Sequence, residues 1–482
     1  MKLKRASVHA ALAIVIGTSL GLAEERTWTD ADSGRTLKGE FLGLSGGTVK
    51  LKRSSGKVIE VALAKLSVAD QTFVKAAAKG GAAGGAEWPS WRGANRDGHS
   101  PDKGLLKAWP EGGPKLLWTF TDCGKGYSSP AVVGGRLFTT GSRKGKAEII
   151  CLDAAKGEEL WAAGMGGDPE KGYNTNWGAG TRGAPTVSEG LVYAISANGE
   201  LVCVSAADGS KKWSKNLLSD FGGGIPKWGY SESPLVDGDK LIVTPGGKDG
   251  AIVALDKKTG KKLWQSKDLT NGAEYASVVI AEAKGKRQYV QLFQKTLAGV
   301  DAENGDLLWS SPWPGGRVAV VPTPIYHDGH VYMTSGYGAG CKLVKIDGGG
   351  AEVAWQNKVM KNHHGGVILV DGYLYGFSDG SGLVCQDLKS GEKKWNEKGE
   401  GKNKGAVHYA DGMLYCLDEA QGSVFLAEAS PKGFKEHGRF PLPKQTELRK
   451  GTSGKIWTHP VVIGGRLYLR DQDLVFCYDV KG

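Results

Sequence analysis

The sequence predicts an all-β protein, an eight-bladed β-propeller preceded by a small SH3-like β-barrel. From residue 128 to residue 482, one pattern occurs eight times: a β-rich run, a glycine turn, a second run, and a third ending near Leu-Asp before glycine and tryptophan. A repeat of about 40–50 residues with four β-segments is typical of a propeller blade. The 75 glycines and 15 tryptophans suit many tight turns around a packed core.

The first 23 residues have the pattern of a secretory signal peptide. Residues 1–5 are basic, residues 10–22 are apolar, and residues 21–23 have the small side chains of a cleavage site. The apolar run is short for a spanning helix, and no cysteine follows it to carry a lipid anchor. We therefore expect export to the periplasm or outside the cell, and a mature chain without a transmembrane segment.

Residues 24–78 predict the small β domain. Apolar and polar residues alternate in stretches 26–30, 37–44, 48–52 and 58–61, as in half-buried strands, and a short helical end is expected over 68–78. With Leu63-Ala64-Lys65-Leu66-Ser67 and Asp70-Gln71, this region resembles SLA1 homology domain 1. Whether it binds a ligand or acts as a spacer stays open. A flexible Gly/Ala linker at 79–87 follows, and residues 88–482 form the predicted propeller.

Each repeat carries the same turn chemistry. An aspartate starts the turn with its own backbone hydrogen bond, glycine takes the left-handed conformation, and the aromatic residue fills the gap between blades. The residues at the aspartate position are Asp153, Ser205, Asp256, Asp301, Asp347, Asp387, Glu428 and Asp479. The eighth copy stops before its tryptophan, and residues 116–118 (Leu-Leu-Trp) supply a matching strand upstream. We therefore predict that the N-terminal segment completes the last blade.

The seven cysteines include no adjacent pair and no CxxC. Four of them recur at one position of the repeat, namely Cys151, Cys203, Cys385 and Cys477. A recurring apolar position in a strand indicates core packing by free thiols, in preference to a disulfide framework or a metal site.

The clearest copy, Leu255-Asp256-Lys257-Lys258-Thr259-Gly260-Lys261-Lys262-Leu263-Trp264, resembles the repeat of the pyrroloquinoline quinone (PQQ) propellers. That family contains quinoprotein alcohol and glucose dehydrogenases, and also non-enzymatic relatives such as the barrel-assembly lipoprotein of the outer membrane. For the enzymatic branch, the resemblance implies PQQ and calcium as cofactors.

The chain departs from the enzymatic branch in three respects. It lacks the adjacent Cys-Cys pair, the CxxCH haem motif and the long extra loops of the dehydrogenases. We therefore expect an exported, non-catalytic propeller that acts as a binding or scaffold protein through its central funnel and loops. The alternative is a PQQ- and calcium-dependent oxidoreductase of alcohols or sugars.

A candidate ligand site lies where each innermost strand begins, because these positions ring the mouth of the central channel. The three residues before each inner strand differ from blade to blade, which favours a specific ligand over a merely hydrated channel mouth. With Trp228 from a neighbouring loop, the candidates are Tyr127, Arg182, Trp228, Glu232, Glu274, Tyr275, His363, His364, Lys404, Trp457 and His459.

The histidines and the two glutamates of this funnel are the candidate metal ligands. His363 and His364 are adjacent, so on a strand they point to opposite faces and do not share one ion easily. A quinone cofactor would place calcium on Glu232 or Glu274. No Gly-x-Ser-x-Gly elbow before a helix supports a hydrolase.

The net charge of +11 is spread thinly, much of it on lysines at hairpin turns. Binding to nucleic acid needs clustered basic residues, so the sequence predicts no nucleic-acid partner. The expected partner is a protein, peptide or glycan, and we expect a monomer.

Overall fold

The computed structural model describes residues 26–31, 33–45, 47–53, 55–67, 70–71, 74, 86–313, 319–399, 404–449 and 454–482. The chain forms two compact units, Met1–Gly84 and Gly85–Gly482, and each is described by itself. The predicted signal peptide, most of the predicted linker and most of the helical end at 68–78 lie outside the described residues.

The smaller unit contains one antiparallel sheet in the order β1-β2-β3-β4. Its strands are β1 (Arg26–Thr29), β2 (Thr36–Ser45), β3 (Thr48–Lys52) and β4 (Val58–Ala62), followed by the 3₁₀ helix η1 (Leu63–Lys65). Trp28 is buried at the centre of a small core with Val49, Leu51 and Leu66. The alternating pattern forms because one face of each strand covers this core, and the predicted SH3-like fold is confirmed.

The larger unit is an eight-bladed propeller made of eight sheets, each with four strands in order and one with an added fifth. The first four blades consist of β7 (Ala131–Val133), β8 (Arg136–Arg143), β9 (Lys146–Asp153) and β10 (Glu159–Gly164); β11 (Thr186–Ser188), β12 (Leu191–Ile195), β13 (Glu200–Ser205) and β14 (Lys211–Asn216); β15 (Leu235–Asp237), β16 (Lys240–Val243), β17 (Val253–Asp256) and β18 (Lys262–Gln265); and β19 (Val279–Ala283), β20 (Lys286–Leu292), β21 (Thr296–Asp301) and β22 (Leu307–Pro312).

Blades 5 to 8 continue in the same way. They consist of β23 (Ile325–His327), β24 (His330–Ser335), β25 (Gly340–Ile346) and β26 (Ala351–Asn357); β27 (Val367–Val370), β28 (Tyr373–Ser378), β29 (Gly382–Asp387) and β30 (Lys393–Glu397); β31 (Gly405–Ala410), β32 (Met413–Asp418), β33 (Ser423–Glu428) and β34 (Glu436–Pro441); and β35 (Val461–Ile463), β36 (Arg466–Asp471), β37 (Leu474–Asp479) and β6 (Leu116–Phe120). First strands of neighbouring blades touch one another, as β11 touches β7 and β15, so they line the centre of the ring.

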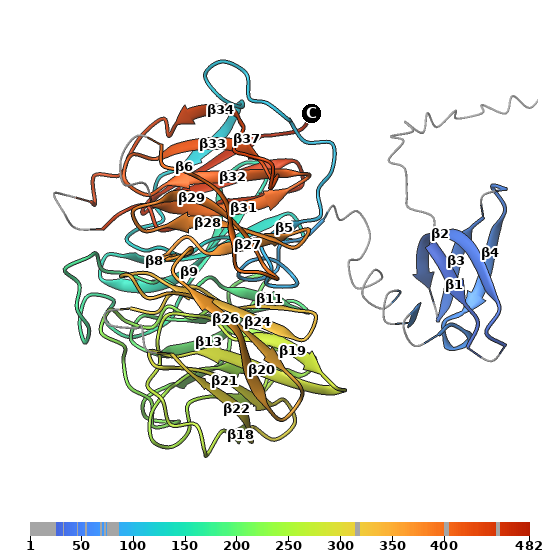
Figure 1. Cartoon of the computed structure of the whole chain (residues 1–482), viewed down its shortest axis with the longest axis horizontal. Coiled ribbons are helices and arrows are strands. Elements are labelled where there is room, and N and C mark those ends of the chain that lie inside the picture. The colour runs from blue at the N-terminus through green and yellow to red at the C-terminus, as the bar shows by residue number, and fades with distance from the viewer. Residues whose placement is uncertain are drawn as a thin grey trace, which may run out of the picture. The chain divides into compact units, whose positions relative to one another are not determined.

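The last blade is closed by the N-terminal strand, as predicted. Strand β6 pairs with β37, with Trp118 opposite Cys477, and in Figure 1 β6 lies among the C-terminal strands. The pairing covers the edge of β37, which would otherwise present unpaired backbone groups. Trp118 also donates from Nε1 to the carbonyl of Ala154 in blade 1, at 3.2 Å, so it joins the first and last blades.

The repeated glycine has a second role beside its left-handed conformation. A Cβ atom on Gly157 would lie 2.5 Å from the ring of Trp118, and one on Gly260 would lie 2.8 Å from Trp213 in the preceding blade. This position of the turn must therefore carry no side chain, so that the tryptophan can pack against its backbone. The fifth copy differs, because the left-handed glycine directly follows its aspartate, as Gly348 after Asp347.

All seven cysteines are buried and free, as the packing prediction requires. Cys203 lies opposite Tyr193 on the neighbouring strand, and Cys385 lies opposite Tyr375, so each thiol fills the space beside a ring. Burial raises the pKa of the Cys203 thiol to about 12, which leaves it protonated and unreactive.

Candidate functional site

The centre of the ring is crossed by residues 88–105, a segment that we call the plug. It has hydrogen bonds with every blade. The bonds join Trp88 to Val132, Pro89 to Val187, Arg96 to Ser233, Arg96 to Val278, Trp91 to Thr323, Arg92 to Val367, Gly98 to Tyr409 and Asp102 to Gly465. Short strand β5 (His99–Ser100) lies within the plug and pairs with β31 in parallel. The plug therefore closes the central channel of the propeller.

Two buried arginines hold the plug in place. Arg96 donates to the carbonyls of Val278, at 2.9 Å, and Ser233, at 3.0 Å, and so ties blade 4 to blade 3. Arg92 donates to the carbonyl of Val367 in blade 6 at 2.6 Å. Burial lowers the pKa of both guanidinium groups to about 10, so both remain charged at neutral pH. These charges are stabilised by backbone carbonyl dipoles.

Above the plug lies a pocket of about 520 Å³ at one end of the channel, with Trp91 of the plug among its lining residues. Nine of the eleven predicted residues line it. They are Tyr127, Arg182, Trp228, Tyr275, His363, His364, Lys404, Trp457 and His459. The start of each inner strand therefore does lie at the mouth, as the repeat pattern indicates. Their role in binding a ligand stays a prediction.

One wall of the pocket is a continuous row of rings. His363 stacks on His364 with 3.8 Å between ring centroids, and His364 stacks on Trp457 at 4.5 Å. Tyr127 extends the row beyond Trp457 at 5.0 Å, and Tyr337 meets the edge of His363 at 4.2 Å. Such a row presents a large, mostly apolar surface.

The expectation that His363 and His364 point to opposite faces is wrong. Both residues precede β27, which begins at Val367, so the alternation of side chains along a strand does not apply to them. Burial is the main cause that lowers the pKa of His363 to about 2 and of His364 to about 3. Both imidazoles are therefore neutral at physiological pH.

The facing wall contains Trp228 and Tyr275, whose ring centroids are 6.0 Å apart. The hydroxyl oxygen of Tyr275 accepts a hydrogen bond from the backbone N–H of Trp228 at 3.2 Å, which fixes the loop that carries the tryptophan. At the rim, Trp177 lines the pocket while 47% of its surface is exposed. Its carbonyl accepts a hydrogen bond from Tyr127 at 2.8 Å.

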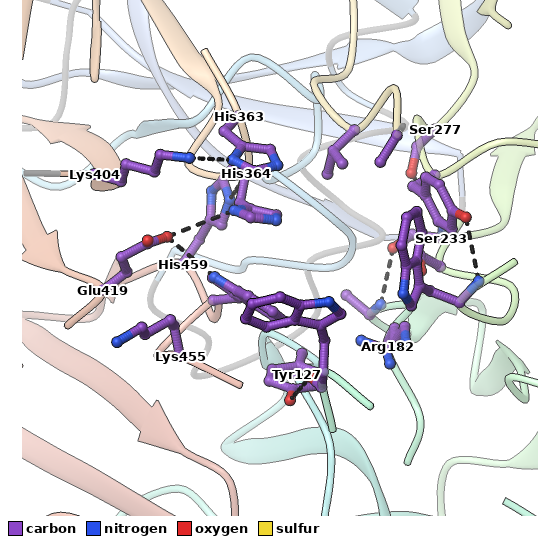
Figure 2. A pocket seen from close by; sticks show the side chains of 18 of the residues that line it. Tyr127, Arg182, Ser233, Ser277, His363, His364, Lys404, Glu419, Lys455 and His459 are labelled. Carbon is purple, nitrogen blue, oxygen red and sulfur yellow. Dashed lines mark hydrogen bonds and ion pairs between the residues drawn. The ribbon is translucent and has the colours of Figure 1, made fainter. Parts of the chain in front are cut away.

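The charged groups lie on two sides of the pocket. Figure 2 shows Lys404, Glu419 and Lys455 on one side and Arg182 on the other. Lys404 pairs with Asp379 at 3.2 Å, and Glu419 accepts from the indole N–H of Trp457 at 3.0 Å. The guanidinium of Arg182 lies over the face of Tyr127, 4.8 Å from the ring centroid.

Glu232 and Glu274 are not among the lining residues of this pocket. Glu232 is buried and accepts hydrogen bonds from the backbone N–H of Thr244, at 2.6 Å, and from its hydroxyl, at 2.9 Å. Glu274 accepts a long bond from the N–H of Val320. Burial raises the pKa of each carboxyl to about 7.

Several lining residues escaped the sequence prediction. Tyr337 comes from the loop between β24 and β25, and Glu419 comes from the loop between β32 and β33. These loops lie between the second and third strands of their blades, whereas the prediction considered only the start of each first strand. Trp91 and Lys455 were also missed. The sequence offered a signal for Trp91, because a tryptophan outside the repeated pattern is a candidate for a binding surface.

The residues of the pocket do not fit a quinone held with calcium. Calcium needs six to eight oxygen ligands, usually with several carboxylates. Among the described residues, Glu419 is the single carboxylate that lines the pocket, and no group of three His, Cys, Asp or Glu is placed to hold a metal ion. Of the two expected calcium ligands, Glu232 already accepts hydrogen bonds from Thr244, and Glu274 is not among the lining residues.

Comparison with known proteins gives the family. A family model described as "Outer membrane protein assembly factor BamB" matches residues 145–397, which is more than half of the chain. The chain belongs to this family. A model of SLA1 homology domain 1 matches residues 22–80, in agreement with the fold of the smaller unit.

Two relatives with assigned names are distant from this chain in sequence. The outer membrane protein assembly factor BamB of Yersinia pestis is 22% identical over 306 residues, covering 59% of this chain and 70% of that one. A quinohemoprotein alcohol dehydrogenase of Pseudomonas putida is 28% identical over 156 residues, which are 31% of this chain and 21% of that one.

Two solved structures share the propeller fold. BamB from Moraxella catarrhalis has a TM-score of 0.53 at 18% identity, covering 76% of this chain and 97% of that one. A europium-containing methanol dehydrogenase has a TM-score of 0.59 at 12% identity, covering 80% and 89%. At these identities the likeness shows the fold alone. In the described part of this chain, no helix has the length and apolar character needed to cross a membrane.

Proposed function

We propose that this chain is an exported, non-catalytic binding protein that holds a polypeptide segment of a partner in the pocket above the plug. The observation that carries the proposal is the pocket itself, which is closed by Trp91 below and walled by rings on both sides. Concave, mostly aromatic sites with a few polar groups are typical of ligand binding. The relatives named as assembly factors favour a protein partner.

The serines of the pocket favour binding over catalysis. Ser233 accepts a hydrogen bond on its hydroxyl from the backbone N–H of Ala184, at 2.9 Å, and Ser277 accepts one from the N–H of Ser233, at 3.0 Å. Ser231 donates to the carbonyl of Gly229. These hydroxyls hold neighbouring blades and loops together, and within the described residues none of them is hydrogen-bonded to a histidine or carboxylate that could activate it.

Site-directed photo-crosslinking in the native host tests the proposal. A benzophenone amino acid replaces Trp177 at the rim, and the same substitution at Leu263, which is 50% exposed on outer strand β18, serves as the control. We expect a protein adduct from position 177 that position 263 does not give. Val321→Trp, which fills the pocket from its lining, should abolish the adduct.

Two results would overturn the proposal. The first is an absence of adduct at position 177, or an adduct that Val321→Trp leaves unchanged. The second comes from adding PQQ and Ca²⁺ to the purified exported protein. A bound quinone absorbance together with dye-linked oxidation of an alcohol would identify an oxidoreductase in place of a binding protein.

A further inference from the structure

We infer that the pocket selects an acidic peptide segment, in which a carboxylate side chain stands next to an aromatic one. This inference rests on the proposed function and names the chemistry of the segment that the pocket accepts. It is carried by the balance of charges in the pocket and by the arrangement of its rings.

The lining contains more positive than negative charge. Its cations are Arg182, Lys404 and Lys455, and Glu419 is the carboxylate among the described lining residues. Lys404 is compensated by Asp379, which lies behind it. Arg182 is partly buried and forms no ion pair with any described residue. Lys455 also forms no ion pair with a described residue, but its charge favours the ionised form of Glu419, whose pKa is raised mainly by burial. A ligand carboxylate would supply the missing negative charge.

Arg182 is prepared to receive such a group. Its Nη2 donates to the carbonyl of Gly178 at 2.6 Å, and its guanidinium rests on the face of Tyr127, so the side chain is held in place before a ligand arrives. The Nε atom is buried and has no acceptor within the described structure. A guanidinium held in this way loses little side-chain entropy when it binds a carboxylate, which favours an acidic ligand.

The rings determine what accompanies the carboxylate. Trp228 and Tyr275 form one wall, and the row containing Trp457 and His364 forms the other. Both histidines in this row are neutral, so they add aromatic surface without adding charge. A side chain between the two walls is therefore favoured when it is flat and apolar, which in a peptide means Phe, Tyr or Trp.

The pocket's size limits the ligand to a short segment. A volume of about 520 Å³ accommodates a ligand of drug-like dimensions, comparable to two or three amino-acid residues. The exposed Trp177 at the rim leaves the chain on either side of such a segment free to continue outward. An acidic residue and its aromatic neighbour are the smallest segment that uses both the cations and the rings.

Calorimetric titration of the full exported protein with capped peptides tests the inference. The probe is acetyl-Ser-Gly-Asp-Phe-Gly-Ser-amide, compared with versions in which Asn or Lys replaces Asp, or Ala replaces Phe. We expect the Asp-Phe peptide to bind about tenfold more tightly than the Asn-Phe peptide, which corresponds to one charge-assisted hydrogen bond. Replacement by Lys or Ala should also weaken binding.

Protein variants separate a specific site from general attraction. Arg182→Gln should weaken binding of the Asp-Phe peptide about tenfold, and Lys455→Gln, on the other side of the pocket, should weaken it by a smaller factor. Neither variant should change binding of the Asn-Phe peptide. Lys261→Gln removes a positive charge from an exposed turn of blade 3 and should change neither affinity. Because Lys455 is a partly exposed lining residue, its variant keeps the test valid even if Arg182→Gln disturbs the fold.

The inference is overturned if Asp and Asn peptides bind equally, if none binds at millimolar concentration, or if Lys261→Gln acts as strongly as Arg182→Gln. It is also overturned if an oligosaccharide of glucuronic acid displaces the peptide and binds more tightly, which would assign an acidic glycan. A crosslinked partner at position 177 combined with failure of the acidic peptides would retain the proposed function and reject this inference alone.

Discussion

The ammonium of Lys404 donates a hydrogen bond to Nδ1 of His363, with 2.5 Å between the two nitrogens. An ammonium has no lone pair, so Nδ1 must be the acceptor and the proton of the neutral imidazole must sit on Nε2. The same lysine pairs with Asp379 and is one of the causes, after burial and His364, that lower the pKa of His363. Lys404 thus sets the tautomer of a ring in the pocket wall.

Lys404→Met should raise the pKa of His363, because a neighbouring positive charge is removed while burial remains. In the unsubstituted protein, NMR titration of the imidazole should show the Nε2–H tautomer and no protonation above about pH 4. Lys398→Met, on an exposed residue outside the pocket, is the control. A wild-type His363 that titrates near pH 6.5 would contradict this assignment.

Trp118→Ala should destabilise the propeller by about 3–5 kcal/mol, the usual cost of removing a large buried aromatic ring. The ring joins blades 8 and 1, and its loss also weakens the pairing of β6 with β37. Leu117→Ala is the matched control, since this neighbour on the same strand is 36% exposed. Urea unfolding measures both, and similar losses from the two substitutions would show that Trp118 does not close the ring.

The propeller was predictable because its chemistry is local and repeated. The turn aspartate, the bare glycine and the packed tryptophan occur within about ten residues of one another, as in Asp256, Gly260 and Trp264. Closure by β6 followed from a repeat that lacks its tryptophan strand. The plug was not predicted, because Arg92 and Arg96 bind backbone carbonyls, and a carbonyl leaves no signature in the sequence.

The candidate site was predictable in part for a similar reason. Residues just before an inner strand have a fixed place in every blade, so Arg182 and Trp457 could be assigned to the mouth. Tyr337 and Glu419 reach the same pocket from loops between second and third strands, whose paths the repeat does not determine. The stacking of His363 on His364 depends on a loop conformation and not on strand alternation.

Arg96→Lys should destabilise the larger unit by about 3 kcal/mol, because an ammonium cannot bridge the carbonyls of Val278 and Ser233 together as the planar guanidinium does. Arg439→Lys is the control, since Arg439 is 45% exposed in its side chain and pairs with Glu436 at the surface. This change should cost less than about 1 kcal/mol. Equal effects in thermal or urea unfolding would mean that the plug contributes little to stability.

Glu232 gives the fold a pH dependence of defined sign. Burial raises its pKa from 4.5 to about 7 in the folded chain, so the unfolded chain loses its proton first as the pH rises. The stabilisation is complete below about pH 4.5 and is lost between pH 4.5 and 7, by about 3 kcal/mol in total. Above pH 7 the contribution stays constant.

Glu232→Gln removes this titration while keeping an oxygen that can accept the backbone N–H of Thr244. The free energy of unfolding of the wild type relative to the variant should therefore fall by about 2–3 kcal/mol between pH 5 and pH 8. Buried histidines such as His408, whose pKa burial lowers to about 3, titrate alike in both proteins and cancel in this difference. Urea unfolding at the two pH values measures it, and an unchanged difference would show that Glu232 is ionised in the folded chain at pH 5.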